Sequence, residues 1–203
     1  MQITLNNVGK RFNRDWIFRH LSYEFAAKKK YAITGSNGSG KSTLLQVLSG
    51  ALSHNEGKVQ FITPGVIVEE EYQYRHIAIA APYLELIEEM TATEFLNFHK
   101  KFKLFSQPNK EILQLVGLQK AANKQIRYYS SGMKQRLKLA QAFFTDSPIL
   151  LLDEPTTNLD AEGIALYHLL IKNYTNNKLV VISSNDLQEY EFCDAILSIG
   201  DFK

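Results

Sequence analysis

Apolar and polar side chains alternate over the first 25 residues of the chain. Ile3 and Leu5 lie two positions apart, and Leu21, Tyr23 and Phe25 repeat the same spacing. Because successive side chains of a strand point to opposite faces, this period of two predicts strands with one buried and one exposed face. We expect these short strands to form an antiparallel edge.

Several later stretches are apolar without alternation, which is typical of strands that are buried on both faces. They are residues 31–35, 57–62, 76–80, 149–152, 178–183 and 195–199. Helical periodicity covers residues 161–173, between two of these stretches, and a helix is expected from about residue 41 to residue 52. The alternation of strands and helices predicts an α/β fold with a mostly parallel sheet.

Between about residues 84 and 146 the pattern is helical throughout, with no strand between the helices. The positions that carry it are Phe95, Leu96, His99, Ile112, Leu115, Val116, Met133, Leu137, Ala140 and Phe144. We therefore expect a helical lobe over about 84–146, inserted into an α/β core of about 1–83 and 147–203. Since no Ser/Gly linker or internal repeat interrupts the sequence, residues 1–203 are expected to form a single domain.

The composition indicates a folded chain that is close to neutral. Apolar residues make up 45% of it, and 23 basic residues face 21 acidic ones, for a net charge of +2. This balance excludes the highly charged type of disordered chain and gives no argument for a nucleic-acid partner. The short basic run Lys28-Lys29-Lys30 is expected to be a solvated turn.

The cysteine content and the lengths of the apolar runs bear on the compartment. Cys193 is the single cysteine, so no intramolecular disulfide can form and a reducing compartment is expected. The start MQITLNN lacks the basic and then apolar pattern of a signal peptide. Apolar runs such as 149–152 and 179–182 fall far short of the roughly 18 to 20 residues that a membrane span needs. We expect a cytoplasmic protein.

A glycine-rich loop supplies the strongest chemical signal. The run Gly35-Ser36-Asn37-Gly38-Ser39-Gly40-Lys41-Ser42 fits G-x-x-x-x-G-K-[ST], after an expected strand and before an expected helix. The glycines let the backbone turn its N–H groups inward, and the helix N-terminus adds partial positive charge, so the loop is predicted to cradle a polyphosphate. We expect Lys41 to neutralise the β- and γ-phosphates, Ser42 to ligate Mg²⁺, and Thr43 to reach the α- or β-phosphate.

A second chemical signal is a pair of acidic residues at the end of a buried strand. The apolar run 149–152 is followed directly by Asp153 and Glu154. In parallel sheets this end of a strand opens onto the ligand edge. Asp153 is therefore predicted to hold the shell of the Mg²⁺ ion, and Glu154 to polarise the water that attacks the γ-phosphate.

Together these motifs resemble the ATP-binding cassette ATPases, and specifically the nucleotide-binding subunits of ABC transporters, over essentially the whole chain. The family's signature helix begins with L-S-G-G-Q, and Tyr129-Ser130-Ser131-Gly132-Met133 occupies the corresponding place. The run Asp153-Glu154-Pro155-Thr156-Thr157-Asn158-Leu159-Asp160 is similar to the family's Walker B segment and D-loop. The resemblance implies a P-loop NTPase fold.

The resemblance also implies a site that two subunits share. Two such subunits pack head to tail, as a homodimer or a heterodimer, and ATP on the Lys41 loop of one is completed by Ser130, Ser131 and Gly132 of the other. Asp160 acts across the same interface. The family stacks adenine on an aromatic side chain, for which Phe12 is the best match and Trp16 the competitor.

The chain departs from the family at two positions that bear on hydrolysis. Residues 80–84 read Ala80-Ala81-Pro82-Tyr83-Leu84, without the glutamine of the family's Q-loop. Asn185 stands where the family has its switch histidine, and an asparagine can bind a phosphate oxygen but cannot shuttle a proton near neutral pH. We therefore predict slow hydrolysis, with Glu154, Lys41 and Asn185 as the catalytic residues.

By this resemblance, the expected function is that of an ATP-binding and hydrolysing subunit that powers a separate membrane permease. The subunit would lie peripherally on the cytoplasmic face of the membrane, with the segment 82–90 receiving a coupling helix of the permease. The alternatives are an ATPase that acts on nucleic acid or the ribosome, and a weakly hydrolytic regulatory partner.

Overall fold

The computed structural model describes residues 1–63 and 65–203, which form two compact units. The sheet unit comprises Met1–Ile77, Pro148–Glu154 and Asn177–Lys203, and the helical unit comprises Ala78–Ser147 and Pro155–Asn176. The prediction that residues 1–203 form a single domain, with a lobe at 84–146, stays a prediction.

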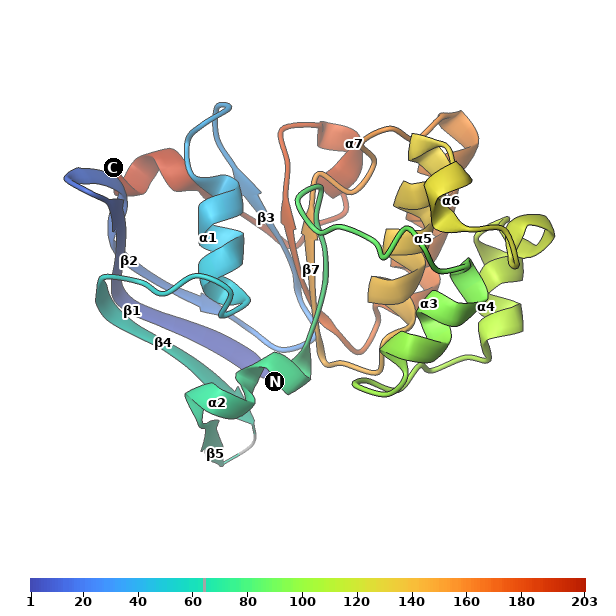
Figure 1. The fold of residues 1–203 in the computed structure, drawn as a ribbon. Coiled ribbons are helices and arrows are strands. Elements are labelled where there is room, and N and C mark those ends of the chain that lie inside the picture. Colours follow the sequence, from blue (N-terminus) through green and yellow to red (C-terminus); the bar gives the residue numbers. More distant parts are fainter. Residues whose placement is uncertain (64) are drawn as a thin grey trace. The chain divides into compact units, whose positions relative to one another are not determined.

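An antiparallel sheet in the sheet unit contains β1 (Gln2–Phe12), β2 (Asp15–Phe25), β4 (Glu56–Thr63) and β5 (Val66–Val68), in the order β2-β1-β4-β5 (Figure 1). Ile3 pairs with Phe25 on one side and with Phe61 on the other, and all three are fully buried. The apolar positions of the first 25 residues therefore alternate because they face the core from antiparallel strands. The predicted antiparallel edge is confirmed.

The stretch 57–62 requires a correction. It forms a strand, β4, but this strand pairs antiparallel with β1 and does not belong to the parallel sheet. Phe61 is its one buried residue, because β4 has only one face against the core. The sequence looked like that of a buried strand because the core-facing Phe61 has apolar residues, Val59 and Ile62, close to it in the sequence.

The strands β7 (Ile149–Asp153), β8 (Leu179–Ser183), β3 (Lys30–Thr34) and β9 (Ala195–Ser198) pair in parallel, in that order. Every residue of β7 and β8 is buried, which explains why both runs are apolar without alternation. The helix α1 (Lys41–Leu48) packs against them. The predicted α/β fold with a mostly parallel sheet is confirmed.

The helix α1 ends earlier than the predicted residue 52. Its last residue is Leu48, and the N–H of Ser49 bonds to the carbonyl of Leu45. Gly50 follows with φ +74°, a left-handed conformation that ends a helix and that glycine adopts at little cost. The prediction extended the helix to residue 52 because it did not take Gly50 as the end of the helix.

Short elements complete the sheet unit, and one strand lies at the border between the two units. The short elements are α2 (Glu70–Gln73), η1 (Tyr74–His76), α7 (Leu187–Tyr190) and η4 (Ile199–Phe202). The strand β6 (Ile77–Ala80) begins at the last residue of the first segment of the sheet unit.

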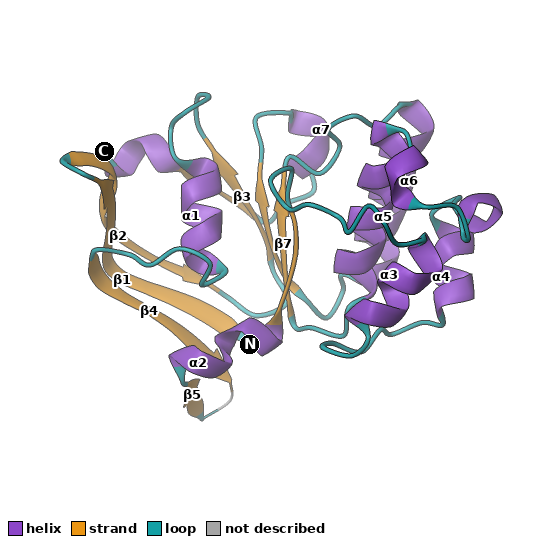
Figure 2. Cartoon of the chain, viewed as in Figure 1, coloured by secondary structure: helices purple, strands orange, loops and turns teal. Residues whose placement is uncertain are grey.

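Four helices make up most of the helical unit (Figure 2). They are α3 (Ala92–His99), α4 (Asn109–Leu115), α5 (Ser131–Phe144) and α6 (Ala161–Tyr174), with the short turns η2 (Gln119–Ala121) and η3 (Ile126–Tyr128) between α4 and α5. The edge of one ring meets the face of the other between Phe143 and Tyr167, which joins α5 to α6. No strand is assigned among the described residues 84–146, as predicted.

Membrane-spanning segments were sought in the helices as well as in the sequence. Across residues 1–63 and 65–203, no helix combines the length and the apolar character that crossing a bilayer requires.

Candidate functional site

The glycine-rich loop connects β3 to α1 within the sheet unit. Gly40 has φ +106°, and a Cβ atom at this position would lie 2.3 Å from Cγ2 of Ile17. Gly38 has φ +76° in open space. Both positions therefore need glycine, the first for conformation and for space, the second for conformation alone. The path of the backbone thus explains why the sequence has glycine at these two positions.

Lys41 folds back over the loop. Its side chain is buried, and Nζ donates hydrogen bonds to the carbonyl oxygens of Gly35 at 2.8 Å and Ser36 at 3.4 Å. The ammonium group is thus held at the centre of the loop by carbonyls. These are weaker partners for a cation than the phosphate oxygens that the loop is predicted to receive.

A cavity of about 230 Å³ opens on the same loop. It is lined by Ile17, Asn37, Gly38, Ser39, Gly40, Lys41, Ser42, Thr43 and Glu154. The fold therefore brings the predicted catalytic carboxylate and the predicted phosphate-binding residues to one cavity. The strand end and the loop are over 100 positions apart in the sequence, and the parallel sheet joins them.

Asp153 is the last residue of β7 and is 2% exposed. Its Oδ1 atom is buried without a hydrogen-bond partner, as are the hydroxyl oxygens of Ser39 and Ser183. Buried polar atoms without partners are rare and need an explanation, and a ligand that is bound in the working state provides one. A carboxylate of this kind fits a Mg²⁺ site.

The donor set near Asp153 also limits how Mg²⁺ can be held. Among the described residues, no group of three or more His, Cys, Asp or Glu side chains is arranged to bind a metal ion. Proteins usually bind Mg²⁺ through one or two carboxylates together with substrate phosphates and water, and a single buried carboxylate is compatible with such a site.

Glu154 has a left-handed backbone, with φ +42°, and its N–H donates to the carbonyl of Ser183 at 2.9 Å. A non-glycine residue in this region is uncommon and is often found at functional sites. The turn takes the chain out of the buried strand, so that Glu154 is exposed directly after the buried Asp153.

Asn185, after β8, contacts the loop directly. Its Nδ2 atom donates to Oδ1 of Asn37 at 3.0 Å, and its Oδ1 atom accepts from the N–H of Gly35 at 3.4 Å. One side chain therefore joins two positions of the phosphate loop. The sequence predicted that Asn185 would replace a histidine, but it carried no signal of this double contact.

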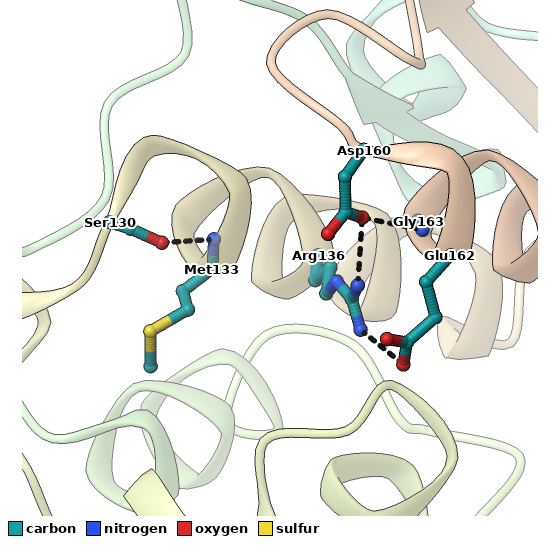
Figure 3. A network of polar contacts seen from close by, with 6 residues as sticks. All are labelled: Ser130, Met133, Arg136, Asp160, Glu162 and Gly163. Carbon is teal, nitrogen blue, oxygen red and sulfur yellow. Dashed lines mark hydrogen bonds and ion pairs between the residues drawn. The ribbon is translucent and has the colours of Figure 1, made fainter.

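The second group of predicted residues lies in the helical unit, at the N-termini of α5 and α6 (Figure 3). Ser130 caps α5, with its hydroxyl accepting from the N–H of Met133 at 3.2 Å. Asp160 caps α6, with Oδ1 accepting from the N–H of Gly163 at 2.8 Å. Both side chains thus have the ordinary capping role.

Arg136 of α5 connects the two helix starts, and sequence reasoning missed it. Its guanidinium donates to Asp160 at 3.1 Å and to Glu162 at 3.4 Å, and its side chain is only 14% exposed. The N–H of Gly163 and then Arg136 lower the pKa of Asp160. Neither charge pattern nor spacing predicts a contact between residues 24 positions apart.

The same ends of α5 and α6 border a second cavity, of about 350 Å³, within the helical unit. Its lining includes Ser130, Ser131, Gly132 and Asp160, together with Arg136. A Cβ atom on Gly132 would lie 3.1 Å from the carbonyl oxygen of Asn158, so little space remains around this residue. The predicted signature residues are therefore gathered at one exposed helix start.

The two candidate adenine-stacking residues lie on the antiparallel sheet. Phe12 is 47% exposed, and Nζ of Lys10 lies 4.9 Å from its ring centroid. Two guanidinium groups lie near the ring of Trp16, those of Arg19 at 4.4 Å and Arg11 at 5.4 Å from its centroid. Neither ring lines the cavity on the phosphate loop, and the choice between them stays a prediction.

The segment without the expected glutamine is held by a lysine of the signature helix. Nζ of Lys138 donates to the carbonyl oxygens of Pro82 at 3.0 Å and Ala81 at 3.4 Å. Burial lowers the pKa of Lys138. Backbone carbonyls thus meet a cation where the family pattern has an amide side chain.

The parallel sheet, the glycine-rich loop and the acidic strand end define a nucleotide-binding protein of the P-loop class. The family model for "ABC transporter" matches residues 18–157. An uncharacterized ABC transporter ATP-binding protein of Bacillus subtilis, YybJ, is 30% identical over 98% of this chain and 92% of its own length. The chain belongs to the ABC transporter family.

Two further comparisons agree with this assignment. The cytochrome c biogenesis ATP-binding export protein CcmA of Agrobacterium fabrum is 30% identical over 91% of this chain and 88% of its own length. The dimeric structure of a bacterial ABC transporter cassette has the same fold, with a TM-score of 0.82 over 98% of this chain and 95% of the other, at 23% identity. The chain is the ATP-driven subunit of a transporter, an ATPase of the ABC type.

Proposed function

We propose that the chain binds Mg-ATP in the cavity on the phosphate loop and hydrolyses it slowly, as one half of a two-subunit ATP site that drives a membrane permease. The observation that carries the proposal is the hydrogen bonding of Lys41 at the loop and of Asp153 at the end of β7. Lys41 is held by two carbonyls, and the buried Oδ1 atom of Asp153 has no partner.

The residues of the sheet unit bind and orient the nucleotide. Backbone N–H groups of the loop bind the polyphosphate, apart from those of Gly35 and Ser39, which already donate to Asn185 and Ser36. Lys41 exchanges the carbonyls of Gly35 and Ser36 for phosphate oxygens. Ser42 and Asp153 would hold Mg²⁺, which when bound would supply positive charge to the phosphates. Glu154 orients the attacking water and accepts its proton, which its exposed position at the cavity supports.

The two departures from the family pattern support slow turnover. Asn185 has no proton to exchange near neutral pH, and its amide already bonds to Asn37 and Gly35. Residues 80–84 include no side-chain amide, and Nζ of Lys138 donates to the carbonyl oxygens of Ala81 and Pro82. We therefore assign the positioning of the attacking water to Glu154. A weakly hydrolytic, regulatory subunit would bind ATP at the same site and is a form of the same proposal.

The helical unit serves the ATP of a partner subunit. The hydroxyl of Ser130, together with the backbone N–H groups and partial positive charge at the start of α5, forms an exposed anion site for a γ-phosphate. The dimeric state of the similar transporter cassette supports a head-to-tail pair, in which Ser131, Gly132 and Asp160 also face the partner's nucleotide. Phe12, or else Trp16, stacks on the adenine.

The permease places the subunit on the cytoplasmic face of the membrane. The names of the relatives, among them an export protein, support this location. A cavity of about 600 Å³ in the helical unit, lined in part by Glu85, Leu86 and Lys138, supports segment 82–90 as the place where the permease docks.

The test is co-purification of a tagged Glu154→Gln variant from native membranes under Mg-ATP. Loss of the base should trap the closed dimer, because ATP binds but is not consumed. A multi-span protein identified by mass spectrometry is the expected partner. Ribosomal proteins or nucleic acid in its place would contradict the permease and favour the soluble alternative, and the Glu154→Gln, Lys41→Ala double variant is the control that cannot close on ATP.

A further inference from the structure

Residues 98–104, which we name the basic–aromatic segment, expose large apolar side chains between lysines. The segment begins in the last turns of α3 and reads Phe98-His99-Lys100-Lys101-Phe102-Lys103-Leu104 (Figure 1). Phe102 is 71% exposed and Leu104 is 70% exposed. The ring of Phe98 meets that of Phe102 at 5.1 Å between centroids, so these two exposed rings form one apolar feature.

The backbone of this segment is fixed by hydrogen bonds at both ends. The N–H groups of Phe102 and Lys103 donate to the carbonyl of His99, and the N–H of Asp146 donates to the carbonyl of Leu104 at 2.9 Å. Phe102 and Leu104 therefore project from an ordered turn, and their exposure is a property of the folded unit.

Beneath the segment, His99 anchors the turn to the interior of the helical unit. Its Nε2 atom lies 3.0 Å from the hydroxyl of Thr145, and its ring stacks on Phe105 at 5.0 Å. These contacts hold the His99 side chain against Thr145 and Phe105. The fold thus leaves Phe102 and Leu104 exposed, while Phe105, which follows them, is half-buried.

The charges around the exposed apolar side chains are mainly positive. Lys101 is exposed, and Nζ of the half-buried Lys100 lies 5.9 Å from the ring centroid of Phe105. The half-buried Lys103 lies between Phe102 and Leu104 in the sequence, and Asp146 is the acidic residue bonded to the segment. Lys100 and Lys101 thus directly precede the two most exposed apolar side chains of the segment in the sequence.

A second exposed apolar pair in the chain has the opposite charge environment. Val66 and Ile67 of β5 are 62% and 57% exposed, and three glutamates follow at residues 69–71. Anionic surfaces repel this pair and attract the basic–aromatic segment. The difference in charge sign identifies the kind of surface that each exposed pair fits.

We propose that the basic–aromatic segment docks on the anionic surface of a lipid bilayer. Phe102 and Leu104 enter the headgroup region, while Lys100 and Lys101 keep their charged ends at the lipid phosphates. The proposal rests on the proposed function in one respect, because work on a permease brings the subunit to a membrane. It does not involve the ATP-binding residues.

The test measures how the full chain sediments with vesicles of phosphatidylcholine, with and without phosphatidylglycerol. Wild type is expected to bind the anionic vesicles, and Phe102→Ser with Leu104→Ser to lower the partition coefficient by about tenfold. Lys100→Gln with Lys101→Gln should lower it by about fivefold or more and remove the preference for anionic lipid.

Two matched controls separate the segment from general stickiness and general charge. Val66→Ser with Ile67→Ser removes an exposed apolar pair outside the segment, and Lys28→Gln with Lys29→Gln removes two lysines outside the segment, of which Lys29 pairs with Asp194. Both should bind vesicles like wild type. ATP hydrolysis and thermal unfolding should be unchanged in all four variants, so that a failure of this proposal is distinct from a failure at the ATP site.

Three results would overturn the proposal. The first is equal sedimentation of wild type and the Phe102→Ser, Leu104→Ser variant. The second is a loss in the Lys28→Gln, Lys29→Gln control as large as that in the Lys100→Gln, Lys101→Gln variant. The third is capture on native membranes that depends on the segment but disappears when membrane proteins are digested first, which would assign the surface to a protein partner.

Discussion

The phosphate loop and the N-terminus of α5 are both predicted to bind phosphate, but they differ in how far their polar groups are satisfied. At the loop, Lys41 is held by carbonyls and the buried hydroxyl of Ser39 has no partner, and at the ends of β7 and β8 buried oxygens of Asp153 and Ser183 have none. At α5, Ser130 caps its helix, and Asp160 is bonded to Gly163 and Arg136. The loop therefore needs a ligand to complete it, whereas the helix start is already complete and can only add a contact.

This difference predicts which region binds ATP alone. The sheet unit should bind nucleotide in a single subunit, because its unsatisfied groups gain partners. The start of α5 should contribute only when a partner subunit brings a phosphate to it. The variants below test the two regions separately, so that the expectation for each region can be contradicted by itself.

The largest effect is expected for Lys41→Ala. Removal of the ammonium group should weaken ATP binding to the single subunit by about 100-fold or more, because a charge-assisted contact to two phosphates is lost. Isothermal titration with Mg-ATP measures this. Lys28→Ala, a lysine of the sheet unit away from the loop, is the control, and wild-type affinity in the Lys41→Ala variant would reject the phosphate-loop assignment.

A smaller effect is expected for Gly132→Ala at the start of α5. The methyl group lies against the carbonyl of Asn158 and covers the backbone that a partner's phosphate must approach. In a Glu154→Gln background, ATP-driven dimerisation should weaken by about tenfold, while ATP binding to the single subunit stays as in wild type. Analytical ultracentrifugation with and without Mg-ATP separates the two readouts.

The control for this glycine is Gly200→Ala. Gly200 has no left-handed backbone, and the nearest atom to an added Cβ lies 3.6 Å away. The variant should dimerise like the Glu154→Gln parent. If Gly132→Ala also dimerises like the parent, the start of α5 does not face the partner's nucleotide.

The two regions also differ in how well the sequence predicted them. The loop was predictable residue by residue, because its glycines, lysine and serine follow from the local demands of a tight turn before a helix. The contacts of Asn185 with Asn37 and of Arg136 with Asp160 were not, because they join positions 148 and 24 residues apart. Local patterns contain no information about such pairs until the sheet and the helices have brought them together.

The same reason explains the errors in the fold. The apolar run at 57–62 predicted a strand correctly, but its antiparallel partner, β1, is chosen by tertiary packing. The basic–aromatic segment also went unnoticed, because its lysines are interrupted by Phe102 and the run at residues 28–30 is the more compact signal. Exposure of Phe102 and Leu104 is known only once the core is known.

A change of a few-fold is expected for Asn185→His at the loop. A histidine can both donate to a phosphate and exchange a proton, so turnover should rise by about threefold and acquire a titration at a pH of about 6.5. The wild-type asparagine contributes no titration of its own. Steady-state ATPase assays across this pH range measure both effects.

The Asn185→Ala variant provides the control for this residue. It loses both contacts with the loop, to Asn37 and to Gly35, and should turn over more slowly than wild type. Turnover of Asn185→His that is equal to or lower than that of wild type would mean that the asparagine does not limit hydrolysis.

The smallest effect is expected for Glu162→Gln, which tests whether the start of α6 is completed mainly by Asp160. Glu162 is 83% exposed and bonds to Arg136 at 3.4 Å, so its loss should lower the free energy of unfolding by less than about 1 kcal/mol. Asp160→Ala should cost more, because Asp160 both caps α6 and pairs with Arg136. Urea unfolding of the two variants gives the comparison.

A loss in Glu162→Gln as large as that in Asp160→Ala would mean that Arg136 depends equally on both carboxylates. The helix start would then be held by a network of charges, with the cap a minor part, and added salt should weaken it markedly.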